Sequence, residues 1–425
     1  MSDLSLGIDL GTSGIRSAVI DRAGKVVSMA RGSYGVQNPD AVDANLWWTG
    51  VEKCLTNQIA ALRTEGIAPT RIKRIGLDGT SGSMVLTAAD LRPVTRALMY
   101  NSGGFEQEAA RIAALAPDPH ITRGTSSALA RALRLQAEDT RREARHLLHQ
   151  ADFIAAKLMG QGGFSDHNNA LKTGYDPALD AWPEWYGALG LRQDLLPNVP
   201  PAGAPARPIS AEVAARFGLP SDAIIHVGTT DSIAAFLAAA PLRLGMAVTS
   251  LGTTLAIKLL SPHRIDAPEI GLYSHRLGDG WLVGGASNTG GGVLLQDFDA
   301  SQLAELSERI DPATETPLDY YPLSKPGERF PINDPSQPPR MTPRPADDAA
   351  YLHGLLEGIA RIERQCYDAM VARGATWPDA VFTAGGGASN PTWTAIRERV
   401  LGMPLAPAQH SEAAVGTARL VQASA

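Results

Sequence analysis

The chain has 425 residues, a net charge of −6 and an ordinary globular composition, with 44% hydrophobic and 19% charged residues. This length predicts two or three domains with cores of their own. The negative charge excludes a basic footprint for nucleic acid or an anionic membrane, so a phosphate ligand has to be held by local groups. Two distant cysteines without metal-binding spacing, and no apparent export signal or membrane-spanning segment, predict a cytoplasmic protein.

The first predicted element is a β-hairpin, residues 6–21, with the turn Gly-Thr-Ser-Gly at 11–14. Glycines allow the backbone to approach a ligand, and Thr12 and Ser13 add hydroxyls beside exposed N–H groups, which suits phosphate. Asp9 enters this turn, and a carboxylate that faces a polyphosphate needs a cation between them. The stretch therefore predicts a Mg-nucleotide site, with an ordinary glycine-rich hairpin as the open alternative.

A second polar turn follows a buried strand at 72–77. The turn, Asp-Gly-Thr-Ser-Gly-Ser at 78–83, ends a strand in the position where α/β proteins usually bind ligands. Asp78, Thr80 and Ser81 are therefore candidates for holding a polyol. The alternative is a turn whose side chains bond their own backbone.

The middle of the chain mixes helical patterns with polar loops. Residues 106–159 carry helical periodicity, and the loop 165–175 is dense in side chains that suit sugar hydroxyls. A buried strand from Ile224 then leads through a Gly-Thr-Thr turn into Asp231, at the start of a predicted helix. Asp231 is either a helix cap or a general base held at a helix N-terminus.

The second half of the chain begins like the first. Residues 248–260 again read strand, Gly-Thr-Thr turn, strand, which suggests two related domains with the nucleotide between them. A strand at 381–384 leads into three glycines and then Asn390, a turn without side chains to obstruct a flat ring. No P-loop and no well-placed Rossmann motif occurs.

These segments, in this order, resemble the FGGY carbohydrate kinases of the sugar kinase, Hsp70 and actin superfamily. The resemblance covers nearly the whole chain, through segments 7–19, 228–235, 249–258, 384–390 and 412–420. It implies an α/β fold of two ribonuclease-H-like (actin-like ATPase) domains with a central cleft, which close over Mg-ATP and a sugar. We expect domain 1–230 to carry the first phosphate hairpin and the sugar-binding loops. Domain 231–425 then carries the catalytic aspartate, the second phosphate hairpin and the adenosine motif.

The resemblance also implies roles for individual residues. Asp231 is the expected catalytic base, and Asp9 the expected metal ligand. The expected sugar-binding residues are Asp9, Ser13, Asp78, Ser81 and Asp231. The expected ATP-binding residues are Gly11, Thr12, Ser13, Gly252, Thr253, Gly385, Gly386, Gly387 and Asn390.

The sugar is harder to assign. Xylulose kinases carry Gln-Met-His-Gly where this chain has Gly-Thr-Ser-Gly at 79–82, and Trp-x-Asp where it has Tyr100 and Asn101. The pairing of 78–82 with 228–236 is instead similar to the short pentulose kinases of cyanobacteria and plants, whose sugar is D-ribulose. We therefore expect a monomeric or homodimeric enzyme that phosphorylates D-ribulose at O5 to D-ribulose 5-phosphate.

Other functions stay open at this point. The chain could be a kinase for another ketose or polyol, such as D-xylulose, L-ribulose or erythrulose. It could also be an ATP-binding scaffold of the actin and Hsp70 type, or a kinase-like protein that only senses a sugar.

Overall fold

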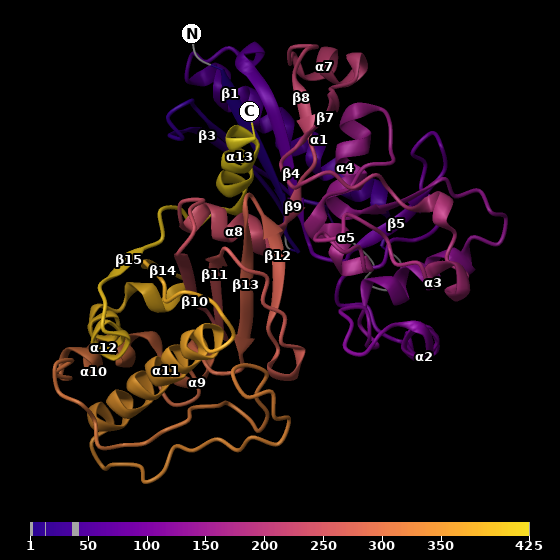
Figure 1. The fold of residues 1–425 in the computed structure, drawn as a ribbon. Helices are drawn as coiled ribbons and strands as arrows, with labels where there is room; N and C mark the ends of the chain where they lie inside the picture. The colour runs from indigo at the N-terminus through magenta and orange to yellow at the C-terminus, as the bar shows by residue number, and fades with distance from the viewer. Residues whose placement is uncertain (1–2, 13, 36–41, 425) are drawn as a thin grey trace. The chain divides into compact units, whose positions relative to one another are not determined.

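The computed structural model describes residues 3–12, 14–35 and 42–424. The chain divides into two compact units, residues 1–238 with 412–425, and residues 239–411 (Figure 1). Each unit has its own β-sheet and its own hydrophobic core. The two units are described separately.

The first unit is built on a mixed sheet. The strands of the whole unit are β1 (Leu4–Leu10), β2 (Ile15–Ile20), β3 (Val26–Gly32), β4 (Ile72–Gly79), β5 (Met84–Thr87), β6 (His146–His149), β7 (Pro205–Pro208), β8 (Ile224–His226) and β9 (Thr229–Thr230). The sheet order is β3-β2-β1-β4-β8-β7, with β9 beside β4. β1 runs antiparallel to β2 and parallel to β4, so the predicted hairpin is confirmed.

The helices of the first unit pack on this sheet and on a second, smaller one. They are α1 (Ala44–Thr64), α2 (Glu106–Leu115), α3 (Ala128–Glu138), α4 (Gln150–Met159), α5 (His167–Thr173), α6 (Tyr186–Leu189), α7 (Ala211–Phe217), α8 (Asp231–Ala239) and α13 (Ala413–Ala423). Every residue of β1 is buried. Alternate residues of a strand point to opposite faces. Leu6 and Ile8 accordingly pack in the core with Trp47 of α1, whereas Gly7 lies against Ala414 of α13.

A small second sheet, β5 with β6, belongs to the same unit and packs with α2 and α3 around a separate core. The expectation of helical structure throughout 106–159 is wrong at His146–His149, which forms β6 and pairs antiparallel with β5. The segment 165–175 likewise contains a short helix, α5, whose N-cap is Asp166. In both places contacts with distant parts of the chain override the local pattern.

The second unit repeats the arrangement of the first. Its elements are β10 (Met246–Leu251), β11 (Leu255–Ser261), β12 (Tyr273–Leu277), β13 (Gly280–Ser287), α9 (Gly291–Leu294), α10 (Ala300–Glu308), α11 (Asp348–Val371), β14 (Ala380–Ala384), α12 (Pro391–Leu401) and β15 (Leu405–Pro407). The sheet order is β12-β13-β11-β10-β14-β15. The hairpin β10–β11 has a parallel partner in β14, as β1–β2 has in β4, so the second predicted hairpin is confirmed.

The units divide the chain at other positions than 230/231. Residues up to 238 and residues 412–425, which include α13, form the first unit. Close packing of small residues explains this. A Cβ atom built on Gly7 would lie 2.0 Å from the Ala414 carbonyl oxygen, and one built on Gly416 would lie 1.9 Å from that of Ala234. Glycine at these positions lets α13 sit directly on β1 and α8.

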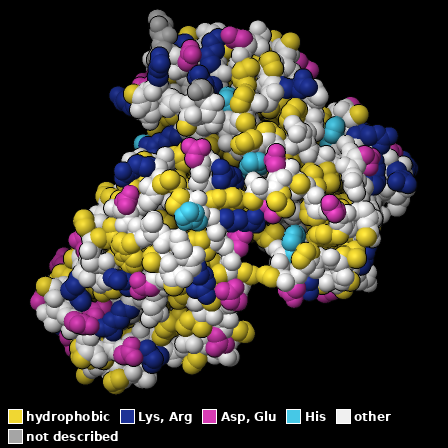
Figure 2. Space-filling model, in the orientation of Figure 1, with side chains coloured by type: hydrophobic (Ala, Val, Ile, Leu, Met, Phe, Trp, Pro, Cys, Tyr) yellow, Lys and Arg dark blue, Asp and Glu magenta, His cyan; other side chains and the backbone are white. Residues whose placement is uncertain are grey.

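The surface charges and the helices match two expectations from the composition, which concern a basic surface and membrane-spanning segments. Figure 2 shows acidic and basic side chains interspersed on the face drawn, without a continuous basic field. None of the helices in the described ranges has the length and apolar character that crossing a membrane would require.

Candidate active site

Three aspartates of the first unit lie at neighbouring strand ends. Asp9, next to last in β1, stands opposite Asp78 of β4 in the register of these parallel strands. β9 pairs with β4 at Thr229, and Asp231 begins α8 directly after β9. The strand pairing therefore places all three residues near one edge of the sheet. This is the edge at which parallel strands present ligand-binding groups.

Asp9 and Asp78 form a buried carboxyl pair. They are 4% and 0% exposed. Burial raises the pKa of Asp78 well above its usual range, and the adjacent charge of Asp9 raises it further. Burial also raises the pKa of Asp9, while contacts with Asp78 and Arg16 act in the opposite direction. Two adjacent carboxylates out of water resist ionising together.

Asp78, one of the expected sugar-binding residues, is fully buried. Its side chain has no exposed surface, and its Oδ2 accepts a hydrogen bond from the Thr417 hydroxyl of α13. Its Oδ1 has no hydrogen-bond partner in the described part of the chain. Asp78 is therefore buried next to Asp9 and hydrogen-bonded to α13.

Arg16 forms an ion pair with Asp9. Its Nη1 lies 3.4 Å from Oδ2 of Asp9, and its Nε lies 3.2 Å from Oε2 of Glu412. Arg16 follows the turn at 11–14 on β2, and Glu412 precedes α13. The ion pairs thus join the hairpin to the C-terminal segment.

The turn of the first hairpin borders a cavity within the first unit. This cavity has a volume of about 660 Å³, and Thr12, Tyr34, Asn101 and Ser102 are among its lining residues. Gly11, which precedes Thr12, is half-buried. Ser13 lies outside the described residues. Sequence reasoning missed Tyr34, whose pKa is raised by burial and by Asp9 and Asp78. No local motif marks it, because it becomes relevant only through the pairing of β3 with β2.

In the polar turn after β4, two hydroxyl groups have hydrogen-bond partners and one has none among the described residues. Thr80 and Ser83 hydrogen bond to each other at 2.6 Å, and Oε1 of Gln150 accepts from the Thr80 amide and hydroxyl. Ser83 also accepts from the backbone N–H of Tyr100 at 2.9 Å. The Ser81 hydroxyl has no partner among the residues that the structure describes. The turn-stabilising interpretation thus fits Thr80 and Ser83, whereas the Ser81 hydroxyl takes no part in that network.

Arg131 fixes the backbone of the same turn. It is 2% exposed, and its guanidinium donates to the carbonyl oxygens of Gly82 at 3.2 Å, Ser126 at 2.9 Å and Tyr100. Burial lowers its pKa to about 10. Gly82 has φ +84°, which favours glycine. Arg131 therefore connects the turn of Ser81 to the segment that lines the cavity.

Asp231 lies at the N-terminal end of α8, as predicted. Its side chain is half-buried, and Oδ1 accepts from the backbone N–H of Ser232 at 2.6 Å. A helix N-terminus stabilises a carboxylate. Asn168, which the sequence placed only in a polar loop, donates from Nδ2 to the Thr229 hydroxyl at 3.1 Å, next to this strand end.

A second cavity lies entirely within the second unit and has a volume of about 570 Å³. The expected ATP-binding residues Gly252, Thr253, Gly386, Gly387 and Asn390 all line it. Gly385 has φ +85°, and a Cβ atom there would lie 2.5 Å from the Leu251 carbonyl oxygen. The close approach of this turn to β10 therefore requires glycine.

The opposite wall of this cavity comes from α9 and α10 and was not predicted. Leu294, Leu295, Leu303 and Ser307 are among its residues, and Leu295 is 63% exposed. An apolar wall with few polar groups suits a flat aromatic base. The sequence signal for this wall is weak, because leucines at helical spacing are typical of any packed helix.

Asn390 lines the cavity but already makes hydrogen bonds within the unit. Its Oδ1 caps α12 by accepting from the backbone N–H of Trp393 at 2.9 Å, and its Nδ2 donates to the Ser307 hydroxyl at 2.8 Å. Asn390 therefore joins the glycine turn to α10 and shapes both walls.

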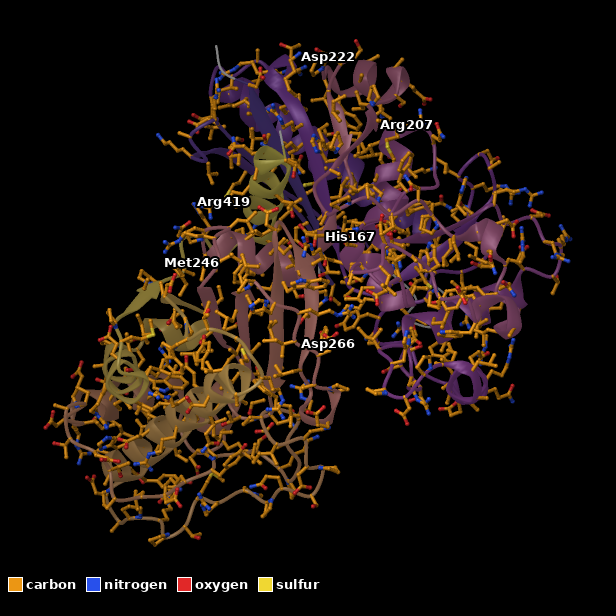
Figure 3. The ribbon with its side chains drawn as sticks, viewed as in Figure 1. His167, Arg207, Asp222, Met246, Asp266 and Arg419 are labelled. Carbon is orange, nitrogen blue, oxygen red and sulfur yellow. The ribbon has the colours of Figure 1, made fainter. Side chains whose placement is uncertain are left out.

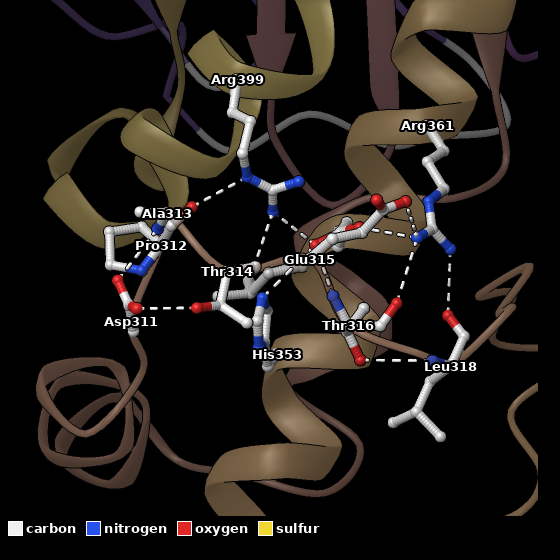
Figure 4. A network of polar contacts seen from close by, with 12 residues as sticks. Asp311, Pro312, Ala313, Thr314, Glu315, Thr316, Leu318, His353, Arg361 and Arg399 are labelled. Carbon is white, nitrogen blue, oxygen red and sulfur yellow. Dashed lines mark hydrogen bonds and ion pairs between the residues drawn. The ribbon is translucent and has the colours of Figure 1, made fainter.

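Paired buried charges hold the helices behind this cavity. Arg397 of α12 and Glu363 of α11 are both fully buried and contact at 2.6 Å, and Arg397 also donates to Thr383 of β14 at 2.9 Å. Figure 4 shows a second network, in which Arg361 and Arg399 approach Glu357 of α11 at 2.6 and 2.5 Å. Burial lowers the pKa of His353, which lies in the same network.

The fold is that of the two-domain actin-like ATPases, as found in sugar kinases. The crystal structure of a xylulose kinase from Brucella ovis superposes with a TM-score of 0.85, at 24% identity, over 99% of this chain and 91% of that chain. Two sheets with matching hairpins and parallel partners are consistent with this likeness.

The chain belongs to the FGGY family of carbohydrate kinases. Residues 4–238 match the N-terminal domain of that family, and residues 247–425 match its C-terminal domain. Similar proteins include a xylulose kinase of Escherichia coli strain K12, 24% identical over 99% of this chain and 90% of the relative. A gluconokinase of Bacillus subtilis strain 168 is 22% identical over 84% of this chain and 68% of its own length. Sugar kinases of this family use ATP.

Proposed function

We propose that this carbohydrate kinase transfers the terminal phosphoryl group of ATP to O5 of D-ribulose, giving D-ribulose 5-phosphate and ADP. The observation that carries the proposal is the Ser81 hydroxyl, which lacks a partner within the described ranges and follows the strand that sets Asp78 beside Asp9. A hydroxyl with open hydrogen bonds, next to carboxylates, suits a polyol. The resemblance of 78–82 and 228–236 to pentulose kinases favours a ketopentose.

In the proposed reaction Asp231 accepts the proton of the sugar hydroxyl. The hydroxyl oxygen forms a bond to the γ-phosphorus as the bond to the bridging oxygen breaks, and ADP leaves. Catalysis of this kind rests on alignment and charge compensation. Backbone N–H groups at Gly11–Thr12 and Gly252–Thr253 would supply part of that compensation.

Asp9 is the residue that fits a magnesium ion. Mg²⁺ is usually held by one or two carboxylates together with substrate phosphates and water. No group of three or more acidic, His or Cys side chains that could hold a metal ion occurs within residues 3–12, 14–35 and 42–424. Bound Mg²⁺ would neutralise charge on the phosphates. Arg16, which pairs with Asp9, would help to keep that carboxylate oriented.

The division of substrates follows the chemistry of each unit. We assign the sugar to the first unit through Asp9, Ser81 and Asp231, with Asp78 buried next to Asp9. We assign adenosine to the apolar cavity bordered by Gly386 and Gly387 in the second unit.

D-xylulose is the second candidate substrate, because the relatives and solved structures that this chain resembles include several named xylulose kinases. The sequence departs from the xylulose kinase motifs at 79–82 and at Tyr100–Asn101, which is why we place D-ribulose first.

A panel assay tests the proposal. The purified chain is incubated with ATP, Mg²⁺ and each of D-ribulose, D-xylulose, L-ribulose, erythrulose, D-gluconate and glycerol, and ADP release is followed. The proposal predicts the highest kcat/KM with D-ribulose and a 5-phosphate product by ³¹P NMR. A higher kcat/KM with another compound would reassign the substrate, and ADP release indifferent to every sugar would contradict the kinase function.

A further inference from the structure

The C-terminal helix α13 covers the face of the first sheet that carries the aspartates. On β1 the alternation of side chains puts Gly7 and Asp9 on one face, opposite Leu6 and Ile8. A Cβ atom on Gly7 would lie 2.0 Å from the Ala414 carbonyl oxygen of α13. Asp9 therefore points to the side on which α13 packs.

The same holds for β4. Gly76 and Asp78 share a face, and a Cβ atom on Gly76 would lie 3.2 Å from Cγ2 of Thr417. The close packing of α13 on Gly76 thus brings Thr417 next to Asp78. The Thr417 hydroxyl donates a hydrogen bond to Oδ2 of Asp78, and both side chains are fully buried. Asp78 stands directly opposite Asp9 in the register of the parallel strands β4 and β1, so the two side chains leave the same face of the sheet next to each other.

α13 also contacts the helix that begins with Asp231. Gly416 lies against Ala234, and Arg419, labelled in Figure 3, donates from Nη1 to the carbonyl oxygens of Leu237 and Ala238 at 3.1 Å each. One helix therefore touches β1, β4 and α8, the three elements that carry Asp9, Asp78 and Asp231.

We propose that Thr417 is a positioning residue for phosphoryl transfer: its hydroxyl fixes Asp78, and Asp78 fixes the orientation of Asp9. This inference rests on the proposed function, because it concerns the same site. The hydrogen bond from Thr417 to Oδ2 opposes rotation of the Asp78 carboxyl group about its Cβ–Cγ bond. Without that anchor Asp78 rotates, and the carboxylate of Asp9 loses the neighbour that sets its angle.

The test uses the full chain and separates the hydroxyl from the volume of the side chain. Thr417→Val removes the hydroxyl with little change in shape, and Thr417→Ser keeps the hydroxyl. We expect Thr417→Val to lower kcat by about 10-fold to 100-fold, the usual range for a partner that orients a reactive group, with little change in the KM for sugar or ATP. Thr417→Ser retains most of kcat. Val421→Thr, a matched change on the same helix against Gly76, is the control and leaves kcat unchanged.

Each outcome decides the inference. A Thr417→Val variant with wild-type kcat, or a Thr417→Ser variant as slow as Thr417→Val, overturns it. If Thr417→Val does not fold, Thr417→Ala lacks the hydroxyl without added bulk and carries the same prediction. If the wild type phosphorylates no sugar, the proposed function fails, and basal ATP hydrolysis then becomes the readout. Equal basal rates in the wild type and Thr417→Val overturn the positioning role, and a loss restored by Thr417→Ser supports it.

Discussion

The two units share a sheet arrangement but treat their buried polar groups in opposite ways. Near the strand ends of the first unit, Asp78 Oδ1, Ser81 Oγ and Asn168 Oδ1 are buried without a hydrogen-bond partner in the described residues. In the second unit the buried carboxylates of Glu357 and Glu363 are each met by arginine. A buried polar atom without a partner is costly, so it persists where function needs it. This contrast favours our proposal that the sugar chemistry belongs to the first unit and that the arginine pairs brace the wall of the second cavity.

The largest expected effect on activity is at Asp231. Asp231→Asn should lower kcat for sugar phosphorylation by about 10²-fold to 10⁴-fold, the usual contribution of a general base, because the amide cannot accept the proton. The affinity for ATP should not change, since we assign adenosine to the other unit. Steady-state kinetics and calorimetry with ATP measure the two quantities. Turnover near the wild-type rate would remove Asp231 from the mechanism.

The largest expected effect on stability is at Arg397. Arg397→Met leaves Glu363 buried without its partner, and we expect the free energy of unfolding to fall by about 3 to 5 kcal/mol. Urea denaturation followed by circular dichroism measures this change. The control is Asp368→Asn, because it removes only the exposed pair of Arg364 and Asp368, whose loss should cost less than about 1 kcal/mol. Equal losses in the two variants would contradict the structural role given to the buried pair.

A substitution at Gly386 should affect only the nucleotide. A Cβ atom at this exposed glycine meets nothing within 4 Å, so Gly386→Val should fold normally and project into the cavity. We expect the KM for ATP to rise by about 10-fold to 200-fold, the scale of discrimination by one or two methyl groups in a pocket. The KM for the sugar serves as the internal control. An unchanged KM for ATP would move the adenosine site elsewhere.

Ser81 and Ser83 offer a matched pair in the first unit. Ser81→Ala removes a hydroxyl that has no partner in the described chain, so we expect the KM for the sugar to rise about threefold to tenfold, the value of one hydrogen bond, with stability unchanged. Ser83→Ala breaks the bonds to Thr80 and Tyr100 and should lower the melting temperature instead. The reverse pattern would show that Ser81 is structural.

A pH dependence of stability is expected from His149. Burial lowers its pKa from 6.5 to about 3, and its Nε2 lies 2.9 Å from the Thr173 hydroxyl. Below pH 6.5 the unfolded chain binds a proton that the folded protein does not, so stability falls as the pH is lowered from 6.5 toward 3, by up to about 1.4 kcal/mol per pH unit. The difference in unfolding free energy between the wild type and His149→Asn should show this slope. A flat difference would contradict a neutral buried His149.

Local patterns in the sequence predicted the parts of the site that depend on a single strand end. Both hairpins, and the positions of Asp9 and Asp231 at the end of a strand and the start of a helix, follow from apolar runs and turn residues. Gly386 and Gly387 line the cavity in the second unit, because a strand followed by a turn without side chains leaves open space.

The remaining features depend on contacts between distant residues. The partner of Asp78 is Thr417, 339 positions away in the chain, and no local pattern connects them. The burial of Asp78, its place next to Asp9 and the return of α13 to the first unit all depend on that contact and on the packing of Gly7 and Gly76. His146–His149 became a strand for a related reason, since its pairing with β5 overrides helical periodicity.

The division of substrates between the two units is the central claim, and binding calorimetry tests it most directly. The wild type, Ser81→Ala and Gly386→Val are each titrated with D-ribulose and, separately, with a non-hydrolysable ATP analogue. The account predicts that Ser81→Ala weakens only the sugar and that Gly386→Val weakens only the nucleotide. Loss of nucleotide binding in Ser81→Ala, with wild-type nucleotide binding in Gly386→Val, would contradict it.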